Sequence, residues 1–365
     1  MSSIPHDTPA PGGAHDNSGE LQELVRVAMH SGAPLWITGG GSKGFYGRPV
    51  SGTPLTTSTH RGIVAYDPSE LVLTVRAGTP LREVEAVLAD QDQMLAFEPP
   101  HFGESATIGG AIATGLSGPR RPYAGAARDF VLGVKLITGQ AEIVAFGGRV
   151  MKNVAGYDVS RLVTGALGTL GVLLEVSLKV LPRPPVDLTL VQHRRTAEAI
   201  EVMNIWARRS LPLSGCWYDG DRLYVRLSGA ESAVRAAHDK IGGEIPANAQ
   251  EIWLALREQR LSFFSGPLPL WRVAVAPASA ALEVPGKWLI DWGGAQRWLK
   301  TDADAETVRR SAAEHGGHAT LFRGSDLSGA VFHPLAPALF ALHRRVKNAM
   351  DPRNIFNPGR MYPDL

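Results

Sequence analysis

Apolar residues recur along this chain at two spacings, one typical of helices and one typical of strands. In residues 20–32 they repeat at three- and four-residue intervals and stop at Gly32, which predicts an amphipathic helix with a glycine at its end. Short apolar runs bounded by glycine, proline or aspartate predict strands. The same criteria predict helices over 80–93, 157–168, 196–209, 231–242, 304–316 and 337–350, strands over 34–38, 63–67, 70–78, 94–100, 171–182, 186–193 and 318–324, and hairpins over 130–148, 214–229 and 287–301.

Prolines mark a boundary in this pattern. Pro182, Pro184 and Pro185 follow a clear strand, and the residues after them have the strand and helix order of an antiparallel α+β layer. The polar N-terminus, rich in proline and glycine, lacks the charged start and apolar core of a signal peptide. We therefore expect a disordered tail over 1–19, a first domain over 20–185, a second domain over 186–335 and a C-terminal segment over 336–365.

Three glycine clusters, at 39–47, 103–118 and 165–171, indicate tight turns and backbone that comes close to a ligand. The first cluster, in APLWITGGGSKGFYG, formally matches G-x-G-x-x-G and G-x-S-x-G. Both motifs need a helix that begins on the glycine turn, and the residues that follow, FYGRPVSGTPLTT, contain too many glycines and prolines for one. This excludes a dinucleotide fold and a hydrolase. It leaves a turn between strands or a backbone nest for an anion.

Composition narrows the function classes. The 44% hydrophobic and 20% charged content is ordinary for a soluble globular protein, and a net charge of +2 gives no electrostatic case for nucleic acid. The single cysteine, Cys216, excludes an internal disulfide and a protein-held iron–sulfur cluster, and it fits a reducing cytoplasm. No apolar run reaches the roughly 18 residues of a membrane span.

Four stretches in order carry a resemblance to a known family. They are TGGGSKGFYG, then EPPHFGESATIGGAIATGLSGPRRPYAGAARDFVLGVKLITG, then GGRVMKNVAGYDVSRLVTGALGTLGVLLEVSLKVLPRP, and finally DPRNIFNPGRM. The chain resembles FAD-linked oxidases of the vanillyl-alcohol-oxidase/PCMH type, and more closely the FAD-binding subunits of bacterial glycolate oxidase (glycolate dehydrogenase). The match covers residues 20–183 and 340–362, and it is loose over 186–335.

The resemblance implies an α+β fold. A PCMH-type FAD-binding domain of two α/β subdomains holds FAD between them, a smaller antiparallel α+β cap domain covers it, and the C-terminal segment returns to the FAD domain. It also assigns the glycine clusters to the pyrophosphate, the flavin and the adenosine half. The cofactor-binding residues that it implies are Gly39, Gly40, Gly41, Ser42, Thr107, Gly109, Gly110, Ala113, Gly115, Lys152, Asn153, Gly168, Gly171 and Val172.

The sequence departs from many relatives at the covalent flavin link. These relatives attach flavin through a histidine beside the first glycines, where this chain has Gly41, Ser42 and Lys43. The other covalent route uses a cysteine in a substrate-side loop, and Cys216 lies in the cap. We therefore expect non-covalent FAD.

The chemistry of the substrate defines a second set of candidate residues. Oxidation of a 2-hydroxy acid needs a base for the hydroxyl proton and a cation for the carboxylate. Arg120 and Arg121 follow the second glycine cluster and His101 precedes it, so these three are the catalytic candidates. The alternatives are a surface arginine pair and a structural histidine. Catalytic relatives resemble lactate dehydrogenases with a motif H-x-G-D-G-N-x-H, which this chain lacks.

The nearest metal candidate is EHGGHA, with His315 and His318. Gly316 and Gly317 break a helix there, so a helix end is favoured and no metal site is expected.

The first hypothesis for the function is an electron-relay or supporting FAD subunit of a glycolate oxidase complex, beside a catalytic flavin subunit and an iron–sulfur subunit. It would be cytoplasmic, with any membrane contact peripheral and through a partner. The alternatives are a self-sufficient FAD-dependent 2-hydroxy-acid dehydrogenase and a non-catalytic scaffold.

Overall fold

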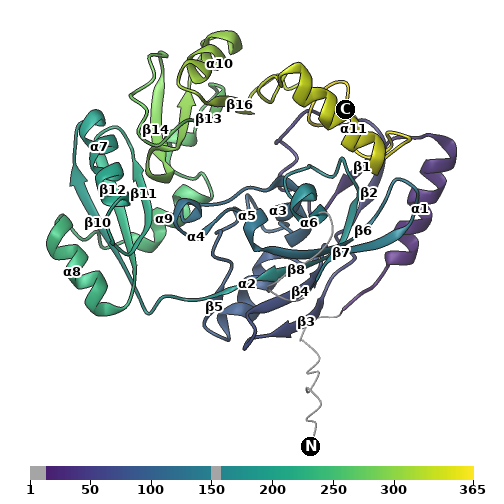
Figure 1. Cartoon of the computed structure of the whole chain (residues 1–365), viewed down its shortest axis with the longest axis horizontal. Helices are drawn as coiled ribbons and strands as arrows, with labels where there is room; N and C mark the ends of the chain where they lie inside the picture. The colour runs from purple at the N-terminus through teal and green to yellow at the C-terminus, as the bar shows by residue number, and fades with distance from the viewer. Residues whose placement is uncertain (1–13, 149–157) are drawn as a thin grey trace, which may run out of the picture.

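The sheets of the computed structural model, which describes residues 14–148 and 158–365, fall into two sets along the chain (Figure 1). Residues 14–185 form what we call the first lobe, 186–335 the second lobe, and 336–365 the C-terminal segment. The first lobe comprises α1 (Ser18–Ser31), β1 (Leu35–Thr38), β2 (Thr53–Thr56), β3 (Ile63–Asp67), β4 (Val72–Arg76), α2 (Leu81–Ala89), β5 (Gln93–Met94), α3 (Ile108–Thr114), α4 (Arg121–Ala124), α5 (Ala127–Phe130), β6 (Val131–Ile137), β7 (Ile143–Gly147), α6 (Val159–Val163), β8 (Val172–Lys179) and β9 (Leu181–Pro182).

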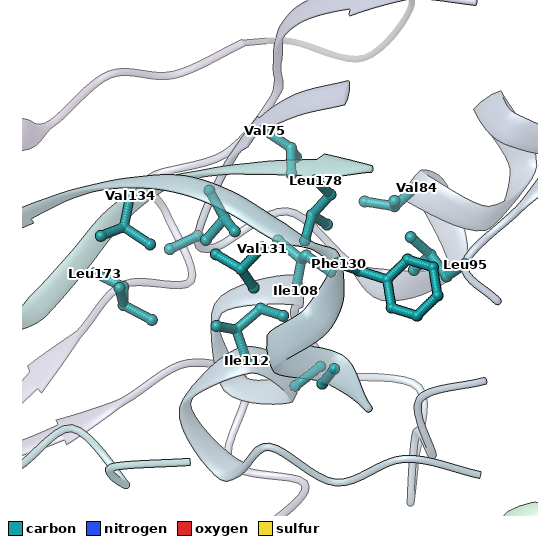
Figure 2. Close-up of a cluster of buried hydrophobic side chains, with 14 of the residues drawn as sticks. Val75, Val84, Leu95, Ile108, Ile112, Phe130, Val131, Val134, Leu173 and Leu178 are labelled. Carbon is teal, nitrogen blue, oxygen red and sulfur yellow. The ribbon is translucent and has the colours of Figure 1, made fainter. Parts of the chain in front are cut away.

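The first lobe is built on a five-stranded antiparallel sheet of order β3-β4-β8-β6-β7. Helix α3 packs against it, and its Ile108 and Ile112 lie in one buried cluster with Val131 and Leu173 (Figure 2). Burial of each isoleucine contributes about 1.5–3 kcal/mol, which fixes the rotation of the helix. The opposite side of α3, with Gly110, is therefore turned away from this core.

The second lobe is a seven-stranded antiparallel sheet of order β10-β12-β11-β14-β15-β13-β16. Its two halves are joined by a single residue pair, Tyr218 with Ile290. The elements are β10 (Val186–His193), α7 (Thr196–Ala207), β11 (Leu213–Tyr218), β12 (Arg222–Gly229), α8 (Glu231–Ile241), α9 (Ala249–Arg257), β13 (Leu270–Ala274), β14 (Lys287–Asp291), β15 (Gln296–Lys300), α10 (Ala305–Glu314) and β16 (His318–Arg323), with short 3₁₀ turns at Ser262–Phe264 and Trp292–Gly294.

The C-terminal segment carries α11 (Pro337–Met350) and returns to the first lobe, where it lies beside β1 (Figure 1). The Leu35 N–H donates to the Ile355 carbonyl at 2.7 Å, and the Asn357 N–H donates to the Leu35 carbonyl at 3.1 Å. The chain end therefore adds an extended segment to the parallel pair β1–β2.

A buried ion pair holds this end in place. Lys347 Nζ lies 2.6 Å from Asp351 Oδ2 and also donates to the Thr169 and Phe356 carbonyls. The Asp351 carboxylate accepts the Ile355 and Phe356 N–H groups in turn. All three ammonium donors and both carboxylate oxygens of the pair are thus used, as burial of two charges requires.

Several predicted elements differ from the structure. Of the strand predicted over 94–100, only Met94 lies in a strand. Glu98 has a φ of 47° and two prolines follow it, which interrupts the hydrogen bonds that a strand makes with its neighbour. Residues 14–19 do not belong to a separate tail: His15 pairs with Arg61, and α1 begins at Ser18. Residues 1–13 of the expected tail lie outside the described residues.

Six helices and strands were not predicted. The strand β2 contains Pro54, which an edge strand tolerates, and α3 is short and hidden in a glycine-rich run. The other four are the short helices α4 and α5, the helix α9 and the strand β13. By contrast, the prediction that no helix starts on the first glycine cluster is confirmed. Asp158 is the N-cap of α6, where its side chain accepts the Arg161 N–H.

Within residues 14–148 and 158–365, no helix combines the length and the apolarity that a membrane crossing needs.

Replacing Lys347 by methionine should destabilise the protein by about 3–5 kcal/mol, because the Asp351 carboxylate would stay buried without its cation. Urea unfolding monitored by circular dichroism measures this loss. A matched control is Arg235→Met, since Arg235 and Glu231 have the same four-residue spacing but are exposed, and it should cost at most about 1 kcal/mol. Equal losses in the two variants would contradict the assignment.

Candidate cofactor-binding site

All three glycine clusters line one cleft in the first lobe. Its walls come from the β1 end and the loop after it, from α3, from the turn before β8 and from the C-terminal segment. The lining residues are Trp36, Ile37, Thr38, Gly39, Gly40, Gly41, Ser42, Lys43, Gly44, Thr57, Ala77, Thr107, Gly109, Gly110, Ala113, Thr114, Leu167, Gly168, Gly171, Leu173, Asn357 and Arg360.

The first glycine loop packs against the second. A Cβ placed on Gly40 would come within 1.5 Å of the Ser105 carbonyl oxygen, and one on Gly39 within 2.3 Å of Thr107 Oγ1. Gly41 differs, because its φ is 75° and a Cβ there would meet nothing within 4 Å. Gly39 and Gly40 are thus required by protein packing, while Gly41 gives a left-handed turn that leaves its backbone open to the cleft.

The second cluster is fixed by backbone contacts at the start of α3. The Gly109 N–H donates to the Ala77 carbonyl at 2.8 Å, and a Cβ on Gly109 would lie 2.6 Å from the Ala77 methyl. The Thr107 hydroxyl caps the helix by accepting the Gly110 N–H. The helix backbone can therefore approach β4 closely, and its Gly110 and Ala113 side faces the cleft.

The third cluster depends on Asn357. Its amide accepts the Ile37 N–H and donates to the Leu167 carbonyl, both at 2.8 Å. A Cβ on Gly168, whose φ is 73°, would lie 2.8 Å from that same amide nitrogen. Asn357 therefore ties the end of β1 to the turn before β8 and sets the width of the cleft between them.

Two cations line the cleft. Lys43 is buried, and its Nζ donates to the His101 carbonyl at 3.1 Å; burial lowers its pKa to about 8, although Glu258 opposes this. The Arg360 guanidinium donates to the Gly44 and Tyr46 carbonyls, and burial lowers its pKa. Neither cation has a carboxylate within ion-pair distance among the described residues. A cleft with open backbone N–H groups and two such cations suits an anionic ligand.

Some predicted site residues lie elsewhere. Gly115 is absent from the lining and ends α3 in a left-handed conformation, with a φ of 61°. Val172 is fully buried in the core with Leu174, so its side chain does not reach the cleft. Lys152 and Asn153 lie outside the described residues.

The three catalytic candidates do not line this cleft either. Arg120 is buried in an ion pair: its Nε lies 3.3 Å from Glu98 Oε1, and the same carboxylate lies 2.8 Å from Arg226 of the second lobe. Burial would raise the pKa of Glu98, but Arg226 and Arg120 outweigh it and hold the pKa below its usual range. Arg120 therefore joins the two lobes.

His101 and Arg121 also have structural contacts. The His101 ring nitrogen Nε2 lies 3.0 Å from Glu85, and only the His101 carbonyl reaches the cleft cation Lys43. The Arg121 guanidinium lies over the Trp292 ring at 4.4 Å, at the junction of the lobes. The sequence brings these three residues near the glycine segment, but the structure separates their side chains.

The candidates His315, His318 and Cys216 lie in the second lobe. His315 ends α10, where its Nδ1 contacts the Ser311 carbonyl, while His318 lies in β16. Cys216 is buried in β11, and burial raises the pKa of its thiol to about 12.

Sequence reasoning missed Asn357 and Arg360, and it did not place Lys43 among the cofactor-binding residues. A signal existed for the first two, because both stand in the terminal stretch DPRNIFNPGRM that carries part of the resemblance. No local pattern shows that Lys43 is buried, since its cover comes from residues 101–102 and 258.

Comparison with known proteins agrees with this geometry. An FAD-binding-domain model matches residues 14–147, and a model of the C-terminal domain of FAD-linked oxidases matches residues 331–361. The Escherichia coli glycolate oxidase subunit GlcE is 50% identical over 96% of this chain and 99% of its own length. A D-lactate dehydrogenase of Archaeoglobus fulgidus is 24% identical over 96% of this chain and 90% of its own.

The solved structure of p-cresol methylhydroxylase with bound substrate superimposes with a TM-score of 0.69, at 16% identity, over 96% of this chain and 88% of its own. At that identity the likeness concerns the fold alone, and it confirms the PCMH-type α+β class. The chain belongs to the family of FAD-linked oxidases that includes the glycolate oxidase subunit GlcE.

Proposed function

We propose that this chain is the FAD-binding subunit of a complex that oxidises glycolate to glyoxylate. The observation that carries the proposal is the half-identical relative named as a glycolate oxidase subunit, aligned over nearly the whole of both chains. The cleft supports it independently, because its lining combines the groups that FAD requires.

The lining fits FAD group by group. Gly41 and Ser42 would offer N–H and hydroxyl donors to the pyrophosphate, with Lys43 and Arg360 supplying positive charge. The side of α3 that carries Thr107, Gly109, Gly110 and Ala113 would lie along the flavin, and Gly168 with Gly171 would lie near the adenosine half. When bound, FAD supplies a two-electron acceptor, and this chain's residues hold it.

We propose that FAD is bound without a covalent link. No histidine or cysteine is among the described residues that line the cleft. Cys216 is buried in the second lobe with a raised pKa, which removes the thiolate that a covalent bond to flavin would need.

We place the chain beside a catalytic flavin subunit and an iron–sulfur subunit, as an electron-relay or supporting subunit. It would be cytoplasmic, with any contact to the inner membrane made through those partners.

We also propose the division of the chain expected from sequence, with two domains and a C-terminal segment that returns to the first. The run of strands from β10 to β16 in one sheet supports this division.

The first experiment is the visible spectrum of the purified full chain, followed by acid precipitation. We expect the spectrum of oxidised flavin before precipitation. After precipitation the yellow colour should stay in the supernatant, because no covalent bond holds the cofactor to the protein. Reconstitution with the partner subunits should then restore glycolate oxidation. A colourless protein would contradict FAD binding, and flavin that stays in the pellet would contradict the non-covalent link.

The affinity for FAD should fall as the pH rises above about 8. Lys43 has its pKa lowered to about 8, so it loses its charge there, whereas a bound pyrophosphate favours the charged form. At about pH 9 the dissociation constant should be up to about tenfold larger than at pH 7. Lys43→Met should weaken binding at pH 7 by about tenfold and flatten this pH dependence.

Quenching of flavin fluorescence measures these constants. Lys240→Met, on the exposed side of α8, is the matched control and should keep the wild-type profile. A Lys43→Met protein with the wild-type affinity and pH profile would show that Lys43 does not contact the cofactor.

Gly40→Ala should lose most of its FAD, because the new methyl group would overlap the Ser105 carbonyl and push the loop out of place. The flavin-to-protein absorbance ratio of the purified variant measures the loss. Gly19→Ala, where a Cβ meets nothing within 4 Å, should keep the wild-type ratio. A full complement of flavin in Gly40→Ala would refute the loop packing.

A further inference from the structure

A broad groove crosses one face of the sheet in the second lobe, and we call it the sheet groove. Helices α7 and α8 cover the opposite face, where they pack around Cys216 and Val225 (Figure 1). The sheet groove has a volume of about 1420 Å³, which exceeds the roughly 300–1,000 Å³ of small-molecule sites. It shares no lining residue with the cofactor cleft. Its size therefore suits a segment of a protein better than a metabolite.

The sheet groove has an aromatic floor and aliphatic edges. Trp217 of β11 and Tyr224 of β12 are buried in the floor, where their rings stack with centroids 4.1 Å apart and an interplanar angle of 6°. Segments 243–248 and 261–268 border the groove and carry Ile245 and Leu268, which are 59% and 44% exposed. Exposed aliphatic side chains around a concave apolar surface are typical of protein contacts.

One hydrogen-bond donor of the floor is unsatisfied. Trp217 Nε1 is shielded from solvent and has no hydrogen-bond partner among the described residues. A buried N–H without an acceptor is destabilising. An extended segment carries main-chain carbonyls along its whole length, so a segment that parts the two bordering segments would bring an acceptor to this ring.

Four of the titratable residues in the sheet groove pair with each other. His193 Nδ1 lies 3.1 Å from Asp221 Oδ2, and Arg222 Nε lies 3.4 Å from Asp219 Oδ2. The exposed carboxylate of Glu244 differs, because the part of the chain that the structure describes offers it no cation within 4 Å. The β10 end of the groove therefore keeps an unpaired negative charge.

Two lysines give the other end of the groove a positive charge. Lys287 of β14 and Lys300 of β15 are direct cross-strand partners, and like charges in this position destabilise a sheet. Lys300 Nζ donates to the Ser265 and Gly266 carbonyls. In residues 14–148 and 158–365, neither lysine has a carboxylate within ion-pair distance. An anion bound at this end would reduce the repulsion.

The strand order separates the two charged ends by a defined length. Glu244 pairs with Val191 on the outer side of β10, and β12, β11 and β14 follow in the sheet. Four steps of about 4.8 Å place Glu244 and Lys287 about 19 Å apart, with the stacked rings of the floor between them. An extended chain rises about 3.3 Å per residue, so about six residues span this distance.

We propose that the sheet groove docks an extended segment of a partner subunit. The segment has an acidic side chain at the lysine pair, a basic side chain at Glu244 and apolar residues over the aromatic floor between them. This inference deepens the proposed function and rests on it only for the source of the segment, a subunit of the same complex. It assigns the contact to a surface remote from the cofactor-binding residues.

Affinity purification of the tagged full chain, co-expressed with the catalytic flavin subunit and the iron–sulfur subunit, tests the proposal. The measured quantity is the amount of each partner subunit bound per flavin-loaded chain. Lys287→Glu should lower this amount about tenfold, because it places a carboxylate against the acidic side chain of the segment. Ile245→Asp should lower it by a similar factor by adding a charge at an apolar contact. Both side chains are exposed, so each variant should keep its flavin.

The matched controls are Lys240→Glu, which reverses an exposed lysine on α8, and Val27→Asp on α1, where the side chain is 59% exposed like that of Ile245. Both should bind the partner subunits as the wild type does. If the wild type assembles and the two groove variants assemble equally well, the inference is overturned while the proposed function stands.

A second copy of this chain is the competing occupant. Sedimentation of the chain alone distinguishes it, because a dimer that Lys287→Glu dissociates would overturn the assignment to a partner subunit. A flavin-loaded wild type that binds neither partner subunit would refute the proposed complex and the source of the segment together. Absence of flavin from the wild type would instead refute FAD binding.

Discussion

The return of the C-terminal segment to β1 is the constraint on which the rest of the structure depends. The Lys347–Asp351 pair fixes the end of α11, and the residues after it reach the cleft as an extended segment beside β1. Asn357 then holds the end of β1 and the turn before β8, and Arg360 holds the end of the glycine loop, all by hydrogen bonds to the backbone. A loop rich in glycine gains its fixed shape here from a distant segment, because glycine alone offers freedom and no rigidity.

A second set of contacts makes the lobes one unit. The Glu98 carboxylate contacts Arg120 and Arg226, and Glu258 accepts the backbone N–H groups of residues 101 and 102. Each carboxylate thus accepts hydrogen bonds from groups of the other lobe. Breaking either contact would leave a charge buried in a medium of low dielectric constant without its partner. This cost holds the two lobes together.

Much of the fold follows from local sequence, and the limits have physical causes. The strands β6, β7 and β8 and the helix α1 have strong periodicity and few alternatives, so they were predicted with nearly their observed bounds. The helix α3 was missed because Gly109 and Gly110 suppress helix propensity, and only its burial against the sheet stabilises it.

The cleft residues were predictable where backbone geometry demands glycine, and the catalytic residues were not. Arg120 and Arg121 are adjacent in sequence, yet Arg120 is neutralised by Glu98 and Arg121 lies over the Trp292 ring. Trp292 belongs to the second lobe, most of which lies between the residues that the two family models match. The second lobe also carries Arg272, which lies close to Tyr46 of the glycine loop and counters the rise that burial causes in the pKa of this tyrosine. The second lobe therefore contacts the same loop, residues 39–47, whose glycines line the cofactor cleft, so the position of that loop depends on both lobes.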